Sequence, residues 1–240
     1  MILAAGRGQR MRPLTDATPK PLLCVGGKSL LVWQIERLAA AGWRDIVINT
    51  GWLGGQIGAA LGPGDAFGVR LRYSAEPPEA FETGGAIATA LPLLGEEPFL
   101  VVSGDIYTTY DYASLRAAAA RVAGDPVRTA AHLVLTPNPE FNPRGDMALD
   151  DVGRIRRRGD LLNYGNIGVF HPSLFAQQPR NVAWKLFPWM YQFVDAGRVS
   201  GERFDGDWHN VGTPAQLAAL DDRLAAERQT PESAEIDRRG

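Results

Sequence analysis

The sequence lacks the residues and patterns that mark several classes of protein. It has one cysteine, Cys24, which excludes an internal disulfide and leads us to expect a protein of the reducing cytoplasm. No apolar run approaches the roughly 20 residues of a membrane-spanning helix. The first residues have no basic leader, so we expect no signal peptide. The formal net charge is only −2, so we expect neither nucleic acid nor a membrane as a partner.

Catalytic patterns based on histidine are also missing. The three histidines, His132, His171 and His209, do not have metal-ligand spacing. No serine stands in a nucleophile elbow that would complete a Ser/His/Asp arrangement. Any chemistry must therefore come from other residues.

Short apolar runs alternate with helical patterns along the 240 residues. The patterns predict helices at residues 29–41, 86–94 and 112–122, and strands at residues 1–5, 46–49, 69–73, 99–102 and 129–135. Such alternation indicates βαβ units and a largely parallel sheet that is covered by helices on both faces. Ligands of such sheets bind at the carboxyl ends of the strands, where Gly6 and Gly104 are expected.

The second half of the chain is less regular. Residues 146–156 are typical of a hairpin with its turn at 151–153, and the aromatic residues of 184–194 predict a core helix. Thr213 and Pro214 are typical of the start of a last helix, at residues 215–228. We expect Cys24 to be a buried bystander in its apolar run, and the polar tail after Gln229 to be disordered.

A loop rich in glycine and basic residues follows the first strand. Gly6-Arg7-Gly8 and Arg10 are followed by Pro19-Lys20-Pro21. Glycines let backbone N–H groups approach an anion, and the guanidinium and ammonium groups supply positive charge. The two prolines are expected to hold Lys20 in an extended segment. This loop therefore suits a polyphosphate.

Three further segments have the composition of ligand sites. Asp105 follows the apolar strand 99–102, where a carboxylate is a natural ligand for Mg²⁺. The glycines of Glu82-Thr83-Gly84-Gly85 would let a planar group lie against the backbone, although Thr83 could equally be a plain helix N-cap. Asn166 stands among glycines before a strand, which suits sugar hydroxyls but is also typical of a turn.

Taken together, these residues resemble the signature of the sugar-1-phosphate nucleotidylyltransferases. The family pattern is a Gly-x-Gly-x-Arg loop followed by Pro-Lys-Pro, and further blocks match in order at residues 82–85, 104–105, 166–168 and 208–214. Within the family, residues 82–85, residues 144–146 and the compact length look most like the uridylyltransferases that act on N-acetylmuramate α-1-phosphate in peptidoglycan recycling. The resemblance implies an α/β fold with a Rossmann-like, mostly parallel sheet, helices on both faces and a small β-rich accessory face for the sugar. One domain is expected over residues 1–228, with a nucleotide-binding part at about 1–110, a sugar-binding part at about 111–214 and a C-terminal helix at 214–228, before a tail at 229–240.

By that resemblance, the roles fall on four groups of residues. The catalytic residues would be Arg10, Lys20 and Asp105. The nucleotide would contact Leu3, Ala5, Gly6, Gly8, Gln9, Arg10, Lys20, Glu82, Thr83, Gly84 and Gly85. The sugar would contact Gly145, Asp146 and Asn166. The cofactor Mg²⁺ would be held by Asp105 and Asn210.

Asn210 departs from the family pattern, which has an aspartate there. An amide oxygen can coordinate Mg²⁺ but brings no negative charge, so metal affinity should fall unless Asp207 or the substrate phosphates compensate.

The resemblance implies an enzyme whose partners are two small molecules, a nucleoside triphosphate (UTP favoured) and a sugar 1-phosphate. Mannose-1-phosphate guanylyltransferase and glucose-1-phosphate thymidylyl- or uridylyltransferase are the alternative activities, and a non-catalytic nucleotide-sugar sensor is the alternative class. A nicotinamide-dependent oxidoreductase is disfavoured, because Met11 replaces the third glycine of Gly-x-Gly-x-x-Gly and no acidic residue ends the second strand. The protein is expected to be a monomer or a small homo-oligomer.

Overall fold

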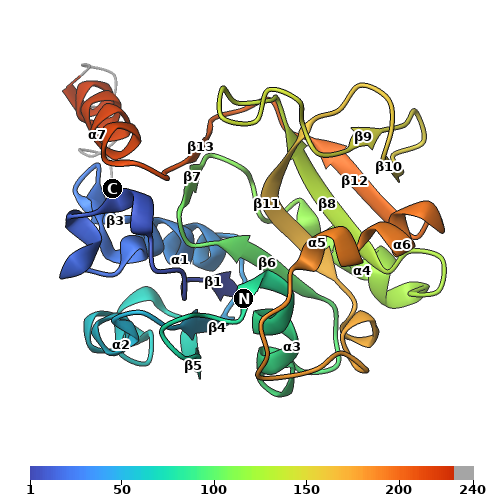
Figure 1. The fold of residues 1–240 in the computed structure, drawn as a ribbon, viewed down its shortest axis with the longest axis horizontal. Helices are drawn as coiled ribbons and strands as arrows, with labels where there is room; N and C mark the ends of the chain where they lie inside the picture. The colour runs from blue at the N-terminus through green and yellow to red at the C-terminus, as the bar shows by residue number, and fades with distance from the viewer. Residues whose placement is uncertain (230–240) are drawn as a thin grey trace.

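A seven-stranded sheet forms the centre of the computed structural model, which describes residues 1–229 (Figure 1). Its strand order is β12-β8-β11-β6-β1-β4-β5. The strands are β12 (Val199–Arg203), β8 (Ala131–Thr136), β11 (Asn163–Phe170), β6 (Phe99–Ser103), β1 (Ile2–Leu3), β4 (Asp45–Thr50) and β5 (Arg70–Ala75). All neighbours pair in parallel except β11, which is antiparallel to both β6 and β8. The expected, mostly parallel sheet is confirmed.

Alternate strand residues face two separate cores, as the twofold period of a strand requires. Ile46 and Ile48 of β4 pack in a cluster with α1 (Leu30–Ala40), α2 (Gly54–Leu61) and α4 (Leu115–Gly124). Val47 faces the other cluster, with α3 (Glu82–Leu94), α5 (Leu186–Trp189) and α6 (Tyr191–Asp195). Helices therefore cover both faces, as expected.

The last helix packs against the segment around residues 23–30 in a third core cluster. The last helix, α7 (Pro214–Gln229), lies beside the small ribbon of β2 (Cys24–Val25) and β3 (Lys28–Ser29) (Figure 1). The Gly26 N–H donates to Asp221 Oδ1 at 2.6 Å, and Arg228 Nη1 donates to the Gly26 carbonyl at 2.9 Å. The C-terminal helix thus supports the segment that follows Lys20.

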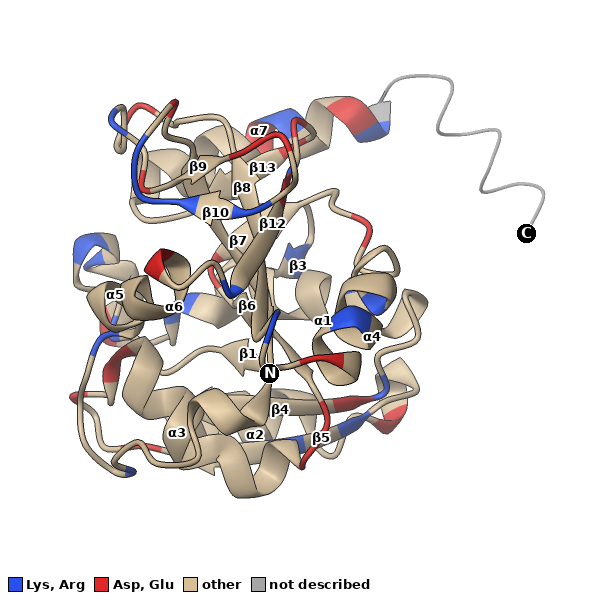
Figure 2. Cartoon of the chain, turned by 90° about the vertical axis from the view of Figure 1, so that its right-hand side faces the viewer, with Lys and Arg blue, Asp and Glu red and all other residues tan. Residues whose placement is uncertain are grey.

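Two other ribbons lie outside the large sheet. One joins β7 (Ile106–Thr108) to β13 (Trp208–Asn210), and the other joins β9 (Ala148–Leu149) to β10 (Ile155–Arg156). The second is the expected hairpin. Its basic rim near β10, visible in Figure 2, is partnered by acidic residues, since Arg156 pairs with Asp150 and Arg157 with Asp195.

Side chains cap the first and last helices, and Thr213 is the cap that the sequence predicts. Ser29 Oγ accepts from the Val32 N–H at 3.2 Å, and Thr213 Oγ1 accepts from the Gln216 N–H at 3.3 Å. The expected single helix at 184–194 is wrong: residues 184–185 lie before two short helices, α5 and α6, and Phe187, which precedes Pro188, has extended dihedrals (φ −107°, ψ 135°) inside α5.

Three further expectations concern Cys24, the tail and membrane-spanning helices. Cys24 is exposed rather than buried, because it alternates with the inward-facing Val25 on β2. Residues 230–240 of the tail that was expected to be disordered lie outside the described residues. Within residues 1–229, no helix has both the length and the apolar character needed to cross a bilayer.

Candidate active site

A cavity of about 340 Å³ opens at the carboxyl ends of β1, β4, β5 and β6. Its wall is made by the segments that follow these strands and by the first turn of α3. The lining residues are Leu3, Ala4, Ala5, Gly6, Arg7, Lys20, Pro21, Asn49, Glu76, Glu79, Ala80, Glu82, Thr83, Ala86, Ser103 and Asp105. Of the expected nucleotide residues, Leu3, Ala5, Gly6, Lys20, Glu82 and Thr83 line it, together with Asp105.

The loop after β1 has two glycines with different roles. Gly6 lines the cavity, and a Cβ at Gly6 would meet nothing within 4 Å, so the protein itself does not require glycine there. Gly8 has φ 65°, and a Cβ there would lie 3.0 Å from Lys20 Cβ. Thr15 Oγ1 donates to the Gly8 carbonyl at 2.9 Å. Gly8 therefore lets the loop pack tightly on the stem of Lys20.

Lys20 and Asp105 form an ion pair at the cavity wall. Lys20 is only 9% exposed, and its ammonium group contacts Asp105 Oδ2. The extended segment expected around Lys20 is wrong, because residues Lys20–Leu22 form a 3-10 turn that Pro19 precedes in an extended conformation. Pro21 fits this turn, because proline is tolerated in the first turn of a helix.

The expected arginine lies beside the cavity rather than in its wall. Arg10 is exposed, and its Nη2 lies 3.2 Å from the point where a Cβ of Gly212 would stand. Gly8, Gln9 and Arg10 are absent from the cavity lining, whereas Arg7 belongs to it. The Arg7 guanidinium stacks over the Trp52 ring at 4.4 Å from its centroid. Sequence reasoning missed Arg7, because the family pattern Gly-x-Gly-x-Arg selects Arg10 and leaves the position of Arg7 open.

The backbone of Asn210, the second expected metal ligand, is held close to the backbone of Asp105. The Val211 N–H donates to the Asp105 carbonyl at 2.9 Å, and Asn210 pairs with Ile106 across the β7–β13 ribbon. The Oδ1 atom of Asn210 is buried and has no hydrogen-bond partner. Asn210 belongs to the wall of a second cavity, of about 390 Å³, rather than to the first.

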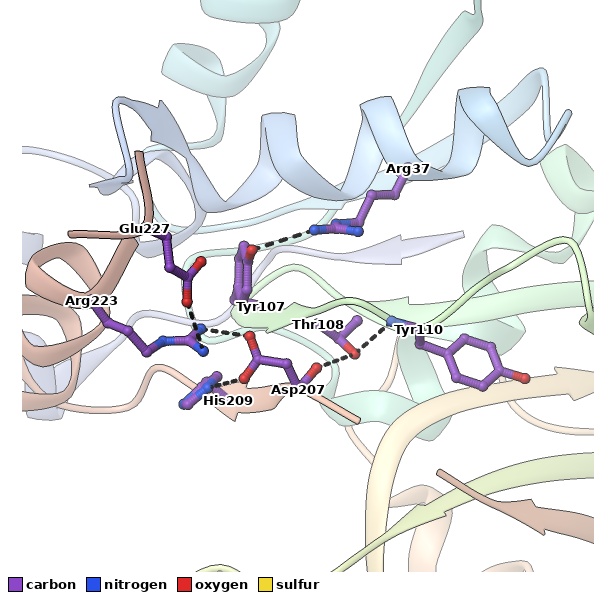
Figure 3. Close-up of polar contacts among 8 residues, drawn as sticks. All are labelled: Arg37, Tyr107, Thr108, Tyr110, Asp207, His209, Arg223 and Glu227. Atoms are coloured by element: carbon purple, nitrogen blue, oxygen red, sulfur yellow. Dashed lines mark hydrogen bonds and ion pairs between the residues drawn. The ribbon is translucent and has the colours of Figure 1, made fainter. Parts of the chain in front are cut away.

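Asp207 is engaged elsewhere and cannot replace the missing charge. Its carboxylate contacts His209 Nε2 at 2.5 Å and Arg223 Nη2 at 2.6 Å, and its carbonyl accepts from Thr108 Oγ1 at 2.9 Å (Figure 3). Burial raises the pKa of this carboxyl, but the hydrogen bonds from Arg223 and His209 outweigh burial and hold the pKa below its ordinary value. Within residues 1–229, no three His, Cys, Asp or Glu side chains are grouped to hold a metal.

The glycines of the α3 segment serve packing. The Gly84 and Gly85 N–H groups both donate to the Trp184 carbonyl, at 3.0 and 3.1 Å. A Cβ at Gly84 would lie 2.2 Å from the Trp184 ring, and one at Gly85 would lie 2.1 Å from the Val182 carbonyl oxygen. Both N–H groups are therefore already hydrogen-bonded within the protein. Thr83 lines the cavity but is not the N-cap, because the helix begins at Glu82.

Two residues of the wall were not singled out from the sequence. Asn49 ends β4 and Glu76 follows β5, and Asn49 Nδ2 donates to Glu76 Oε1 at 2.7 Å. Burial raises the pKa of the Glu76 carboxyl, and hydrogen bonds from Asn49 and the Phe81 N–H act in the opposite direction. A polar residue after the buried run 46–48 was a usable signal for Asn49.

The expected sugar residues do not line the cavity. Asp146 Oδ2 accepts from the Tyr164 N–H at 2.8 Å and from Asn142 Nδ2 at 3.0 Å, so its carboxylate ties a turn to β11. Gly145 (φ 66°) packs against the Leu161 carbonyl in the same turn. Asn166 has φ 57° where the register of β11 shifts. Gly145 and Asp146 therefore lie in a turn, and Asn166 lies at an irregularity of β11 within the large sheet.

Comparison with known proteins gives consistent matches. The family model "Nucleotidyl transferase" matches residues 1–157. The chain is 46% identical over 220 residues to the N-acetylmuramate alpha-1-phosphate uridylyltransferase of Neisseria meningitidis, covering 90% of this chain and 94% of that protein. It is 37% identical to the protein of the same name from Caulobacter vibrioides, covering 94% and 96%.

A solved structure extends the likeness to the fold. It belongs to a Bacillus anthracis protein assigned as a glucose-1-phosphate thymidylyltransferase, in complex with sucrose. The TM-score is 0.79 at 20% identity, over 93% of each chain. The matched family model and the two relatives, which align over 90% and 94% of this chain, place the chain in the family of sugar-1-phosphate nucleotidyltransferases.

Proposed function

We propose that the protein transfers a uridylyl group from UTP to N-acetylmuramic acid α-1-phosphate and releases pyrophosphate. The choice of base and sugar is supported by the names of the two relatives that align over most of the chain. The observation that carries the chemistry is the Lys20–Asp105 ion pair in the wall of a cavity bordered by the glycine-containing loop.

The reaction is an in-line displacement at phosphorus. A phosphate oxygen of the sugar 1-phosphate forms a new bond to the α-phosphorus, and the bond from that phosphorus to the bridging oxygen of the pyrophosphate breaks. Pyrophosphate leaves with the electron pair. The nucleophile is already an anion at neutral pH, so the step needs no general base, and His132, His171 and His209 are all absent from the cavity wall.

The protein's own residues would position the substrates and supply positive charge. Lys20 and Arg7 both line the cavity, where their positive charges would stabilise negative charge on the phosphates. Arg10, beside Gly212, would contact the phosphates from the outer side of the loop. Thr83 and Glu82 would face the nucleobase from the first turn of α3.

Asp105 and Asn210 are the two residues that would hold a Mg²⁺ ion. Asp105 has a carboxylate that is 31% exposed at the cavity, and Asn210 has a buried amide oxygen without a partner. Both are the oxygen ligands that Mg²⁺ prefers. When bound, the ion would supply Lewis-acid stabilisation of the phosphate charge.

A grid of four nucleoside triphosphates against several sugar 1-phosphates, scored by pyrophosphate release, tests the proposal. We expect the highest kcat/KM for UTP with N-acetylmuramic acid 1-phosphate. A preference for GTP with mannose 1-phosphate, or for dTTP with glucose 1-phosphate, would replace the proposed substrates.

Asn210 favours one other function, a sensor that binds the nucleotide without turnover, because the amide supplies less charge to a metal. Binding of UTP without pyrophosphate release from any pair would support the sensor.

A further inference from the structure

A chain of three hydrogen bonds crosses the floor of the cavity from the loop after β1 to the start of α3. The Ala4 N–H donates to Asn49 Oδ1 at 2.7 Å, and Asn49 Nδ2 donates to Glu76 Oε1 at 2.7 Å. The Phe81 N–H donates to Glu76 Oε2, also at 2.7 Å. The chain therefore joins the ends of β1, β4 and β5 to the N-cap of α3.

The backbone N–H groups at the two ends of this series of hydrogen bonds determine which atoms the two side chains between them must present. A backbone N–H can only donate, so the outer atoms of both side chains must accept. Between them, one side chain must supply a donor and the other a second acceptor. One amide and one carboxylate satisfy this pattern, in either order, whereas two amides or two carboxylates do not.

The contacts around Phe81 explain why that position needs support. Its neighbours Ala80 and Glu82 have φ 57° and 59°, which non-glycine residues adopt only when the surroundings hold them there. Glu76 holds the Phe81 N–H, and the Trp184 N–H holds the Phe81 carbonyl at 3.1 Å. Ala80 and Glu82 both line the cavity, so these bonds set its shape on the α3 side.

The backbone at Gly51 also lies close to the backbones of the loops that follow β1 and β5. A Cβ at Gly51 would lie 2.7 Å from the Ala5 carbonyl oxygen and 3.3 Å from the Pro77 carbonyl oxygen. The loops that follow β1 and β5 therefore meet over the end of β4. Asn49 is 3% exposed, so water cannot readily replace its partners.

We propose that Asn49 and Glu76 are a pair of positioning residues that fix the distance between the phosphate-binding loop and the nucleobase-binding turn. The proposal rests on the proposed function, which places the two halves of one nucleotide on these two segments. The pair does not need to contact the phosphates or the base. Its effect is to keep both segments in the arrangement that binds a nucleoside triphosphate.

The donor–acceptor pattern gives a test by exchange. Glu76→Gln leaves two amides, so one N–H faces another N–H. Asn49→Asp leaves two carboxylates facing each other. The double variant, Asn49→Asp with Glu76→Gln, restores all three hydrogen bonds with the roles exchanged. Glu96→Gln is the matched control, because it removes one exposed carboxylate from the loop before β6, outside the cavity wall.

UTP affinity is measured by calorimetry without sugar phosphate, and steady-state kinetics give the KM for each substrate. Each single variant should weaken UTP binding roughly tenfold, the cost of one unsatisfied buried group. The double variant and the Glu96→Gln control should stay within about threefold of the parent, and the KM for the sugar phosphate should change less than that for UTP. Thermal midpoints should fall in the single variants and recover in the double variant.

The outcomes separate this inference from the proposed function. Single variants that bind UTP as the parent does would overturn the positioning role while leaving the function intact. A double variant that is as weak as the two losses combined would also overturn it, because restoring the hydrogen-bond pattern would then not restore binding. A folded parent that binds no UTP would overturn the proposed function, and the positioning role with it.

Discussion

Replacing Lys20 by methionine isolates the charge at the cavity wall. The lysine stem packs on the loop after β1, with Lys20 Cβ and Cδ at 3.0 and 3.3 Å from the point where a Gly8 Cβ would stand. Methionine has an unbranched stem of similar length, so Lys20→Met should keep this packing and remove only the ammonium group. The variant leaves Asp105 without its ion-pair partner.

The size of the effect follows from the burial of the lysine. Two unit charges about 4 Å apart interact by about 4 kcal/mol at an effective dielectric constant of about 20, and by about half of that where solvent screening is stronger. Lys20 is 9% exposed and Asp105 is partly open to solvent, so the interaction energy of this pair lies between these two values. We expect a loss of about 2–4 kcal/mol of transition-state stabilisation, or about 30- to 1000-fold in kcat.

Steady-state pyrophosphate release at saturating UTP and Mg²⁺ measures this loss. Removing the ammonium also frees the Asp105 carboxylate, so the Mg²⁺ concentration for half-maximal rate should stay equal or fall. Lys28→Met is the matched control, because Lys28 is a surface lysine paired with Glu36 and should change kcat by less than about threefold. A Lys20→Met enzyme that is folded by thermal unfolding and has the parental kcat would refute the assigned role.

Three further changes test other parts of the structure. Asn210→Asp should lower the Mg²⁺ concentration for half-maximal rate by about tenfold, because it adds a negative charge beside Asp105; a Mg²⁺ titration of the rate measures it. Trp184→Ala should lower stability by about 2 kcal/mol and raise the KM for UTP, because the ring supports the first turn of α3, whereas Trp184→Phe should do so less; urea unfolding and kinetics measure both. Glu202→Gln should flatten the acid limb of the stability curve. The hydrogen bond from His132 holds the pKa of Glu202 below its ordinary value, so its contribution is present above that value and is lost as pH falls through the lowered one; urea midpoints from about pH 6 to 3 measure it.

Each of these three changes has an outcome that contradicts its reasoning. An unchanged Mg²⁺ titration for Asn210→Asp would mean that Asn210 does not face the ion. A Trp184→Ala variant with lower stability but the parental KM for UTP would limit the tryptophan to a structural role. A Glu202→Gln variant whose stability falls in acid as steeply as that of the parent would assign the acid limb to other carboxyls.

The placement of the site could be predicted from local patterns alone. Continuous apolar runs such as 46–48 and 99–102 predict buried strands, and the alternation with helices predicts a parallel sheet whose carboxyl ends meet. Lys20 and Asp105 are 85 residues apart in sequence, yet each follows a segment that ends at this edge. Their ion pair is consistent with that topology. What the patterns left out was the side-chain pairing between the loops, such as that of Asn49 with Glu76, because pairing depends on register and not on residue type.

The glycines show most clearly where local reasoning ends. A glycine near a ligand site can serve the ligand or the fold, and only the atoms around its missing Cβ distinguish the two. At Gly6 that space is open to the cavity, whereas at Gly84 it is filled by the ring of Trp184, about 100 residues later in the chain. A small side chain therefore has different effects at the two positions. A small side chain at Gly6 would fold without conflict and compete with the nucleotide, whereas the same side chain at Gly84 would displace Trp184 and with it the carbonyl that holds the Gly84 and Gly85 N–H groups. Hence Gly6→Ala should weaken nucleotide binding at unchanged stability, and Gly84→Ala should lower the stability itself, which thermal unfolding with and without UTP would separate.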